Sequence, residues 1–453
     1  MSPQSPILVP SRRSGRPRIA RYTSLSATTT LLRLVALWVT ILGLSLHSVS
    51  ASEGRGPSEP TQSRVAPQQL VSRQLARNES ARPPAPPATQ IGYNEHRTNL
   101  PGGRHANVRT NRAMIIDASA ENRKPIAASL LDQADVWTQF VGWSPDGQTA
   151  IVGRVWESEE NAKWEEQNRQ FRFTSEGWQY DTFLLDMRTG KTTNVTAVDR
   201  VSFYNTGVFF WPGDAKQLGF TALIDGISKP FKMDLDGRNK IDLTKESRGF
   251  AYGFSSSPDG RRISYHENYQ VYLADADGSK RTHVQTGHPF VFAPSWSPDG
   301  KWLAFVSGEH YNCHPHVVQA DGTGLKKLAD RNGYRGVTEF LDVPDFHGGS
   351  SDIPVWSTDS QSLFYTALVD DAVELHQVSL AGNIERLTKS NPGVTHYHPK
   401  PSPDGEWLLY GSKRDGVRNL YLMHLPTRQE RPLTKLAVGE AAMHAHWRPR
   451  SAK

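Results

Sequence analysis

Histidine is the residue type in this chain best suited to binding a metal or moving protons, and three of the 16 histidines form the strongest pattern. His396 and His398 are separated by one residue. Because alternate residues of a strand face the same side, a strand here would offer two imidazoles to one ion. His398 and His444 each lie five residues before a proline, Pro403 and Pro449, so they share a register on two expected strands. The pattern predicts either a metal site or a surface lined by hydrogen-bonded imidazoles.

The elements that must position these histidines are copies of one hairpin. In its clearest copy, Ser295–Val306, Trp296 ends a short strand, Asp299-Gly300 forms a tight reversal, and alternating apolar residues start a second strand. Asp-Gly favours this reversal because glycine accepts the positive φ that the turn needs. Five further copies, two of them degraded, have the turn aspartates Asp146, Asp214, Asp259, Asp359 and Asp404.

Successive turn aspartates are 40 to 68 residues apart. This spacing predicts an all-β fold, a β-propeller of four-stranded blades. The six hairpins give six blades. A seventh forms if His444–Pro449 is an inner strand that pairs with two N-terminal strands, Arg112–Asp117 and Lys124–Ser129, and this pairing also closes the ring without a free edge. We expect seven blades, with six as the alternative.

The histidines gather on one face of this expected ring. Every Asp-Gly turn joins strands one and two of a blade, so these turns share a face. Segments that end a second strand, or that precede or begin an inner strand, belong to the opposite side. The histidines in such segments include His266, His288, His310, His314, His347, His396, His398 and His444. The sequence therefore predicts a histidine-rich face away from the Asp-Gly turns.

The repeat resembles a known family. The Trp-Ser-Pro-Asp-Gly-Lys hairpin at 296–301, with Val-Tyr-Leu-Ala at 271–274 and Leu-Tyr-Leu-Met at 420–423, is similar to the TolB-like, WD40-like (PD40) propellers of bacterial envelopes. The resemblance covers roughly residues 104–450 and implies the fold, because the hairpin belongs to the scaffold. TolB has a folded N-terminal α/β domain where this chain has a proline-rich stretch, so the resemblance does not imply a Tol-Pal role.

A second, local resemblance concerns the first histidine pair. Val394–Pro399, ahead of a Ser-Pro-Asp-Gly turn, is similar to the metal-binding segment of oligogalacturonate lyases, seven-bladed propellers that hold manganese through histidines and a glutamine. The match covers His396, His398 and Pro399, whereas Gly393 replaces the glutamine. The resemblance implies manganese at His396 and His398, with His347 and His444 as candidates for the remaining ligands.

The same resemblance implies a reaction. The metal would neutralise a uronate carboxylate and so acidify the neighbouring C5 proton. A neutral histidine, His288 or His347, would remove that proton as general base. Lys413 and Arg414, in a turn expected on the same face, would hold a second carboxylate. The alternative is that these two residues belong to an ordinary charged hairpin.

A charged insertion, Trp156–Trp178, separates the first two Asp-Gly turns. Its glutamates predict a solvated helix or loop. Its tryptophans, Trp164 in particular, could instead stack on sugar rings as a lid over the face of the ring.

The N-terminal hundred residues differ from the repeats. Residues 1–50 contain six arginines, no lysine and no acidic residue, which accounts for the whole formal charge of +6. With the apolar run Leu34–Leu46 and the small residues that follow, residues 1–51 predict a signal peptide, or alternatively an uncleaved membrane anchor. Residues 52–103 contain few large apolar residues and the run Arg82–Pro87, which predicts a disordered tether. Residues 104–453 would form the propeller, in the periplasm or secreted.

Several function classes are excluded. Because the excess positive charge is confined to the leader, the remainder offers no basic surface for nucleic acid. The chain has no glycine-rich phosphate loop and no Gly-x-Ser-x-Gly nucleophile elbow, and its one cysteine, Cys313, cannot form an intramolecular disulfide. Two functions remain: an envelope module that binds a protein or polysaccharide on the histidine-rich face, or a metal-dependent lyase acting on acidic oligosaccharides.

Overall fold

The computed structural model describes residues 84–168, 172, 176–196, 208–214, 216–224, 227–244, 249–309, 312–336 and 352–450. The chain divides into Met1–Gln69, none of which is described, and Leu70–Lys453, which contains every described residue. The expected signal peptide and most of the expected tether therefore lie outside the described residues. Within the described part, nearly all strand pairs are antiparallel.

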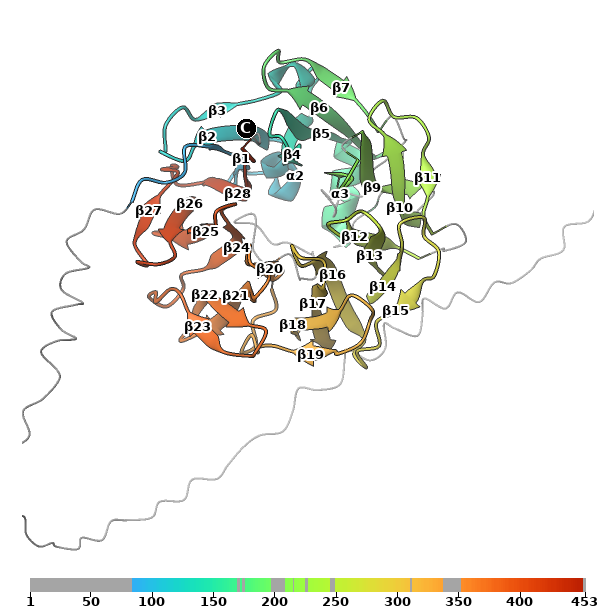
Figure 1. Cartoon of the computed structure of the whole chain (residues 1–453). Coiled ribbons are helices and arrows are strands. Elements are labelled where there is room, and N and C mark those ends of the chain that lie inside the picture. Colours follow the sequence, from blue (N-terminus) through green and yellow to red (C-terminus); the bar gives the residue numbers. More distant parts are fainter. Residues whose placement is uncertain are drawn as a thin grey trace, which may run out of the picture. The chain divides into compact units, whose positions relative to one another are not determined.

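Seven four-stranded blades follow one another around a ring (Figure 1). Six blades consist of consecutive strands. The first three contain β4 (Val136–Trp143), β5 (Thr149–Glu157), β6 (Trp178–Asp186) and β7 (Thr192–Asn194); β8 (Phe209–Phe210), β9 (Gln217–Ile224), β10 (Ile227–Asp234) and β11 (Ile241–Asp242); and β12 (Ala251–Ser256), β13 (Arg262–Glu267), β14 (Gln270–Asp275) and β15 (Thr282–His283). The next three contain β16 (Phe290–Trp296), β17 (Trp302–Glu309), β18 (Asn312–Gln319) and β19 (Lys326–Lys327); β20 (Val355–Trp356), β21 (Ser362–Val369), β22 (Ala372–Ser379) and β23 (Ile384–Arg386); and β24 (His396–Pro401), β25 (Trp407–Arg414), β26 (Val417–His424) and β27 (Glu430–Pro432).

The seventh blade joins the two ends of the described chain. Its strands run in the order β28 (Glu440–Trp447), β1 (Gln90–Arg97), β2 (Arg112–Asp117) and β3 (Lys124–Pro125). One parallel pair, Arg418 with Ala441, links this closing blade to the blade of β24 to β27. The prediction of seven blades closed by N- and C-terminal strands is confirmed.

The closing blade differs from the sequence-based expectation in where the propeller begins and in the length of one strand. β1 lies inside the segment expected to be a tether, so the propeller begins at least as early as Gln90 rather than at residue 104. Only Ile91 and Tyr93 give β1 an apolar face, and this short signal was too weak to detect. The expected strand Lys124–Ser129 is also shorter, because it ends at Pro125 and a 3-10 helix, η3 (Ala128–Leu130), follows.

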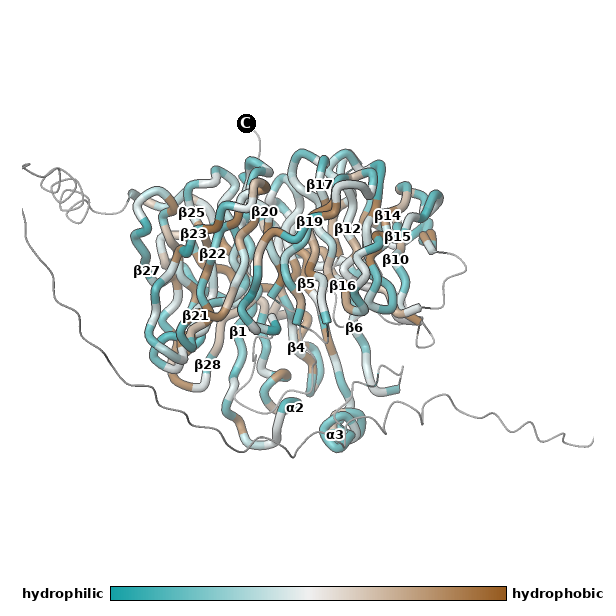
Figure 2. Tube along the Cα trace, turned by 90° about the horizontal axis from the view of Figure 1, so that it is seen from below, coloured by the Kyte–Doolittle hydropathy of each residue, from teal (hydrophilic) through white to brown (hydrophobic). Residues whose placement is uncertain are grey.

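Among the described residues, the α-helices α2 and α3 lie outside the sheets on one face of the ring (Figure 2). Helix α2 (Gly103–Val108) connects β1 to β2, and helix α3 (Glu159–Asn168) connects β5 to β6. Because α3 follows the second strand of its blade, it lies at the opposite end of that blade from the Asp-Gly turn between β4 and β5. The helical interpretation of the insertion is thus confirmed.

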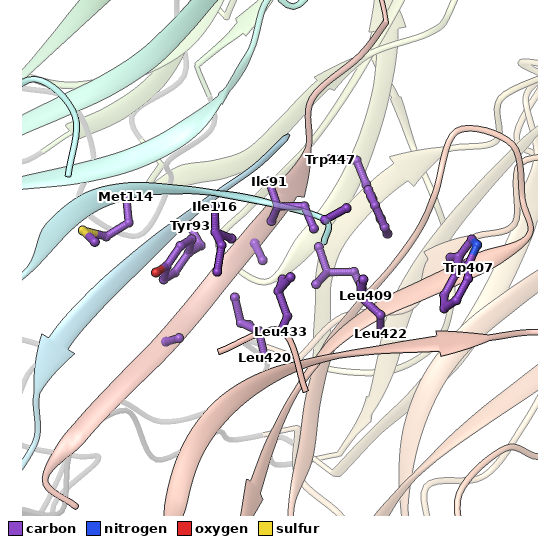
Figure 3. Packing of buried hydrophobic residues seen from close by; sticks show 13 residues of the cluster. Ile91, Tyr93, Met114, Ile116, Trp407, Leu409, Leu420, Leu422, Leu433 and Trp447 are labelled. Carbon is purple, nitrogen blue, oxygen red and sulfur yellow. The ribbon is translucent and has the colours of Figure 1, made fainter. Parts of the chain in front are cut away.

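The core lies between neighbouring blades rather than in one central mass. On β25, Leu409 packs with Ile91, Tyr93 and Met114 of the closing blade (Figure 3). Its neighbour Leu408 faces the opposite way, into the cluster shared with the blade of β20 to β23. Successive side chains of a strand point to opposite faces of its sheet, so a second strand such as β25 contributes to two interfaces. This arrangement explains why second strands such as β17 and β25 are buried along most of their length.

The repeated hairpin is fixed by hydrogen bonds that its serine and aspartate make. In the first copy, Ser144 Oγ donates to Asp146 Oδ1 at 2.6 Å, and the backbone nitrogens of Gln148 and Thr149 donate to Asp146 Oδ1 and Ser144 Oγ at 2.9 Å each. The bond from Ser144 lowers the pKa of Asp146. Three tryptophans before the turns, Trp143, Trp211 and Trp356, bond to the backbone of a neighbouring blade, as when Trp211 Nε1 donates to Gly260 O at 3.1 Å.

The turn glycines also set the distance between blades, which predicts the effect of Gly260→Ala. At φ +69° a Cβ on Gly260 would lie 2.3 Å from Pro212 O of the neighbouring blade, whereas at Gly190, with φ +74°, it would meet nothing within 4 Å. Both substitutions force alanine into a left-handed conformation, which costs about 1–2 kcal/mol. We expect Gly260→Ala to lose a further ~1–3 kcal/mol through overpacking. Chemical denaturation of both variants measures the difference, and equal losses would contradict the contact.

Candidate functional site

The site is built on irregularities in two inner strands. β24 has a bulge between Tyr397 and Lys400, and the pairing of β28 with β1 shifts register at the corresponding place. Within these bulges, His398 and His444 have φ +49° and +51°. His398 lies four residues before Ser402, the first residue of its turn, and His444 lies four residues before Arg448, which follows β28. In that position, two other blades have Gly253 at φ +63° and Ala293 at φ +49°.

Histidine in the left-handed region is uncommon, and such backbone strain concentrates at functional sites. Here the strain brings the two imidazoles together, because the rings of His398 and His444 stack with centroids 4.5 Å apart and planes 23° apart. Bonds between the two strands hold them in place. Tyr397 Oη donates to Ala442 O at 3.0 Å, and Trp447 Nε1 donates to Lys400 O at 3.1 Å. The prediction that these two histidines share a register is confirmed.

Basic groups surround this pair. Burial, and then the nearby His398, His96 and Lys400, lower the pKa of His444 well below its usual value. Burial, with Lys400 and His444, lowers the pKa of His446 to about 3. Burial alone lowers the pKa of Lys400. We call His398, Lys400, His444 and His446 the axial basic cluster, after the inner strands that carry them. Among the described residues, Lys400 has no ion pair with any carboxylate.

A buried carboxyl group supports the cluster from the adjacent blade. The backbone nitrogen of His398 donates to Asp352 Oδ1 at 3.2 Å. Asp352 is held in turn by Thr366 and Arg331, a fully buried arginine whose Nε donates to Thr366 O at 3.0 Å. Burial raises the pKa of Asp352, although Arg331 opposes the shift. These contacts fix the strained backbone of His398.

His396 does not join this cluster. It is fully buried, its Nε2 lies 2.8 Å from Ser390 Oγ and 3.6 Å from Glu374 Oε2, and burial lowers its pKa to about 3. The reasoning from alternate residues on a strand is therefore wrong here. The bulge that begins after Tyr397 interrupts the alternation, so His396 and His398 have different neighbours.

The predicted manganese site depends on that alternation. Among the described residues, no group of three or more histidine, cysteine, aspartate or glutamate side chains is placed to hold a metal. His398 stacks on His444, and Nε2 of His396 faces Ser390 and Glu374. His347, the other candidate ligand and candidate base, lies outside the described residues. The described side chains thus do not fit the metal, and manganese binding stays a prediction.

The other candidates lie in separate environments. His288 Nδ1 is 2.8 Å from Ser307 Oγ, in the blade of β16 to β19. Arg414 makes an ion pair of 2.6 Å with Glu430 and stacks 4.3 Å from the ring centre of Tyr421. The backbone of Lys413 donates to Thr395 O at 2.8 Å. These contacts favour the charged-hairpin alternative for Lys413 and Arg414.

The tryptophans of the insertion also make contacts within the protein. Trp164 on α3 lies under the guanidinium of Arg172, 4.8 Å from the centre of its ring. Trp178 is buried and donates Nε1–H to Glu165 Oε1 at 2.9 Å. Trp178 therefore belongs to the structure beneath α3 rather than to a lid.

Sequence reasoning missed Lys400, His446 and Asp352. A signal for the first two was present, because Lys400 lies two residues after His398 and His446 lies two residues after His444. No sequence pattern links Asp352 to them, since only tertiary packing brings it to the backbone of His398.

Comparisons with known proteins fit the fold. No family model matches the chain. It is 31% identical to the Tol-Pal system protein TolB of Bordetella pertussis over 156 residues, which cover 34% of this chain and 31% of that protein. TolB from Acinetobacter baumannii is similar in structure with a TM-score of 0.43 and 18% identity, covering 70% of this chain and 67% of that one. An oligogalacturonate lyase from Vibrio parahaemolyticus has a TM-score of 0.48 and 12% identity, covering 77% and 86%.

These likenesses are partial. The chain spans less than two thirds of the length of the curated relatives that it matches, between 15% and 56% for the first of them. The sequence matches to TolB agree with the seven blades described above. The described residues therefore form a TolB-like β-propeller.

Proposed function

We propose that this protein is an exported cell-envelope propeller that binds a carboxylate-bearing ligand, an acidic polysaccharide or an envelope protein, at the axial basic cluster. The observation that carries the proposal is the gathering of Lys400, His444 and His446 with no carboxylate paired to Lys400 among the described residues. Lys400 contributes to the lowered pKa values of His444 and His446, and a nearby negative charge favours the charged form of all three half-buried groups. An anionic ligand would supply it.

The backbone supports the same proposal. His398 and His444 are held in strained conformations by Asp352 and by the bonds between β24 and β28. Strain of this kind costs about 1–3 kcal/mol per residue and persists where the surrounding structure enforces it. A rigid pair of imidazoles beside an ammonium group is preorganised for an anion, because little further ordering is needed on binding.

The location is part of the proposal. The basic leader with its apolar run and the sequence likeness to TolB support export to the periplasm. Within the described residues, no helix is long and apolar enough to span a membrane.

Binding of an acidic oligosaccharide tests the proposal. We expect the full chain to bind a short oligogalacturonate in the presence of a chelator, and to bind a neutral galactan fragment of equal length at least ~10-fold more weakly. Lys400→Met should weaken oligogalacturonate binding by about tenfold or more, since removing one partner of a desolvated charge pair costs ~2 kcal/mol or more. Isothermal titration calorimetry measures both effects.

Controls separate the site from general charge effects. Lys301→Met changes an exposed lysine beside an Asp-Gly turn and should bind as the wild type does. An oligoglutamate peptide in place of the sugar distinguishes a protein ligand from a polysaccharide. The proposal fails if Lys400→Met leaves binding of both probes unchanged, or if neither probe binds.

A metal-dependent lyase is the second candidate, favoured by the match at His396, His398 and Pro399. It requires a metal site that the described residues do not assemble, so we derive no mechanism for it. Metal analysis of the purified full chain beside His396→Ala/His398→Ala tests this candidate. About one divalent ion per chain, lost in the variant, together with unsaturated product from oligogalacturonate would support a lyase. A metal-free wild type that releases no such product would exclude it.

A further inference from the structure

A buried ionic cluster joins the two helices that lie on one face of the ring. Helix α2 belongs to the closing blade and helix α3 to the next blade. The backbone nitrogen of Arg104 donates to Glu166 Oε1 at 3.0 Å, and Arg104 Nη1 lies 3.7 Å from Glu157 Oε2 and 3.6 Å from Glu165 Oε2. We call Arg104, His105, Glu157, Asn161 and Glu165 the α2–α3 cluster, and each of these residues is at most 7% exposed.

The cluster brings two carboxyl groups together. Asn161 Nδ2 donates to Glu157 Oε1 and to Glu165 Oε1, at 3.1 Å each. His105 Nδ1 lies 3.2 Å from Glu157 Oε2. Two buried carboxylates this close repel each other, and Arg104 alone cannot neutralise both.

The remaining groups around Glu165 come from the segment after α3 and from β6. The backbone nitrogen of Arg172 donates to Glu165 Oε1 at 2.8 Å, and its guanidinium Nε donates to Asn161 Oδ1 at 2.8 Å. Trp178 Nε1 donates to Glu165 Oε1 at 2.9 Å. One oxygen of Glu165 thus accepts three hydrogen bonds, whereas Oε2 has no hydrogen-bond partner among the described residues.

We propose that the α2–α3 cluster is a proton-operated latch, closed when Glu165 carries a proton and loosened when alkaline conditions remove that proton. In the closed state, one negative carboxylate, Glu157, faces the positive Arg104. Once that proton is lost, both carboxylates face Arg104, and their repulsion weakens the contact between α3 and α2. The latch lies outside the axial basic cluster and does not depend on the proposed ligand.

The electrostatics give the pH range. Burial, and then the charge of Glu157, raise the pKa of Glu165 from 4.5 to about 7. When the latch opens and Glu165 enters water, its pKa returns toward 4.5, so the closed state binds the proton more tightly. The closed state therefore loses stability as the pH rises from about 4.5 to 7, and the loss is complete above 7. From pH 6 to pH 8.5, the opening equilibrium should shift by about tenfold.

Hydrogen exchange of the full chain tests the latch. Peptides that cover α2 and α3 are followed at pH 6 and pH 8.5, with exchange corrected for the pH dependence of the intrinsic rate. We expect opening of α3 in the wild type to rise by about tenfold at the higher pH. Glu165→Gln keeps the acceptor oxygen and imitates the protonated group, so its opening should not change with pH.

Glu159→Gln is the matched control, since Glu159 lies on the same helix but is exposed and paired with Lys163. It should behave as the wild type does. If Glu165→Gln does not fold, Glu157→Gln removes the repulsion from the other side and should also reduce the pH effect. A wild type whose α3 opens equally at both pH values would overturn the proposal, as would an undiminished tenfold rise in both Glu165→Gln and Glu157→Gln.

Discussion

A chain truncated after Gly439 is expected to lose its cooperative unfolding transition. The truncation removes β28, the inner strand of the closing blade, and leaves β1 and the blade of β24 to β27 with exposed edges. Met443 and Trp447 are buried with three alanines of the same strand. Their burial contributes roughly 5 kcal/mol or more, which is comparable with the ~5–15 kcal/mol that stabilises a whole domain. Differential scanning calorimetry measures the loss.

A rescue experiment distinguishes loss of the strand from general damage. A synthetic peptide of residues 440–453, added to the truncated chain, should restore the transition by pairing with β1. The same peptide with Trp447→Ser should restore it less well, because Trp447 packs in the core between the two blades and bonds to Lys400 O. A truncated chain that melts at the wild-type temperature without peptide would show that the ring does not depend on β28.

The second large effect is expected from Arg331→Met. Arg331 is fully buried, and its guanidinium donates hydrogen bonds to Thr366 and to the backbone oxygen of Asp352. Its positive charge also limits the rise in the pKa of the buried Asp352 carboxyl group. Methionine fills a similar volume but removes the hydrogen bonds to Thr366 and Asp352 and the positive charge near the buried Asp352 carboxyl group. Leaving these buried polar groups without partners costs about 3–5 kcal/mol. Urea denaturation measures the loss of unfolding free energy.

Two further variants test the cause. Arg331→Met/Asp352→Asn removes both charges and should be less destabilised than Arg331→Met alone, which a double-mutant cycle would show as a coupling energy. Arg238→Met changes an exposed arginine paired with Asp236 and should leave the unfolding free energy close to that of the wild type. Additive losses at Arg331 and Asp352 would mean that the arginine acts by packing and not by charge.

Arg331 also connects stability to the proposed function. It holds Asp352, and Asp352 accepts the backbone N–H of His398. The strained conformation of His398 therefore depends on a residue from the preceding blade. The proposed ligand site is thus a product of packing between blades, and a substitution that relaxes His398 should weaken binding even where the ring stays folded.

The repeated hairpin determined most of the fold from sequence alone. Asp-Gly with its preceding serine and proline specifies a local turn, and local hydrogen bonds fix that turn wherever it occurs. Counting the copies gave six blades, and the unpaired strands near both ends gave the seventh. β1 escaped detection because Ile91 and Tyr93 alone carry its apolar pattern, and it is recognisable as a strand only through its pairing with β2 and β28.

The candidate site, like the fold, was only partly predictable from the sequence. The sequence placed His398 and His444 in one register, because each lies five residues before a proline. Only the tertiary structure decided which side chains meet, since a bulge reverses the alternation after Tyr397 and separates His396 from His398. The α2–α3 cluster is a further case, because its carboxylates and Arg104 come from two blades. Turn chemistry is local and therefore readable from the chain, whereas strain, bulges and buried charges depend on neighbours that only the closed ring supplies.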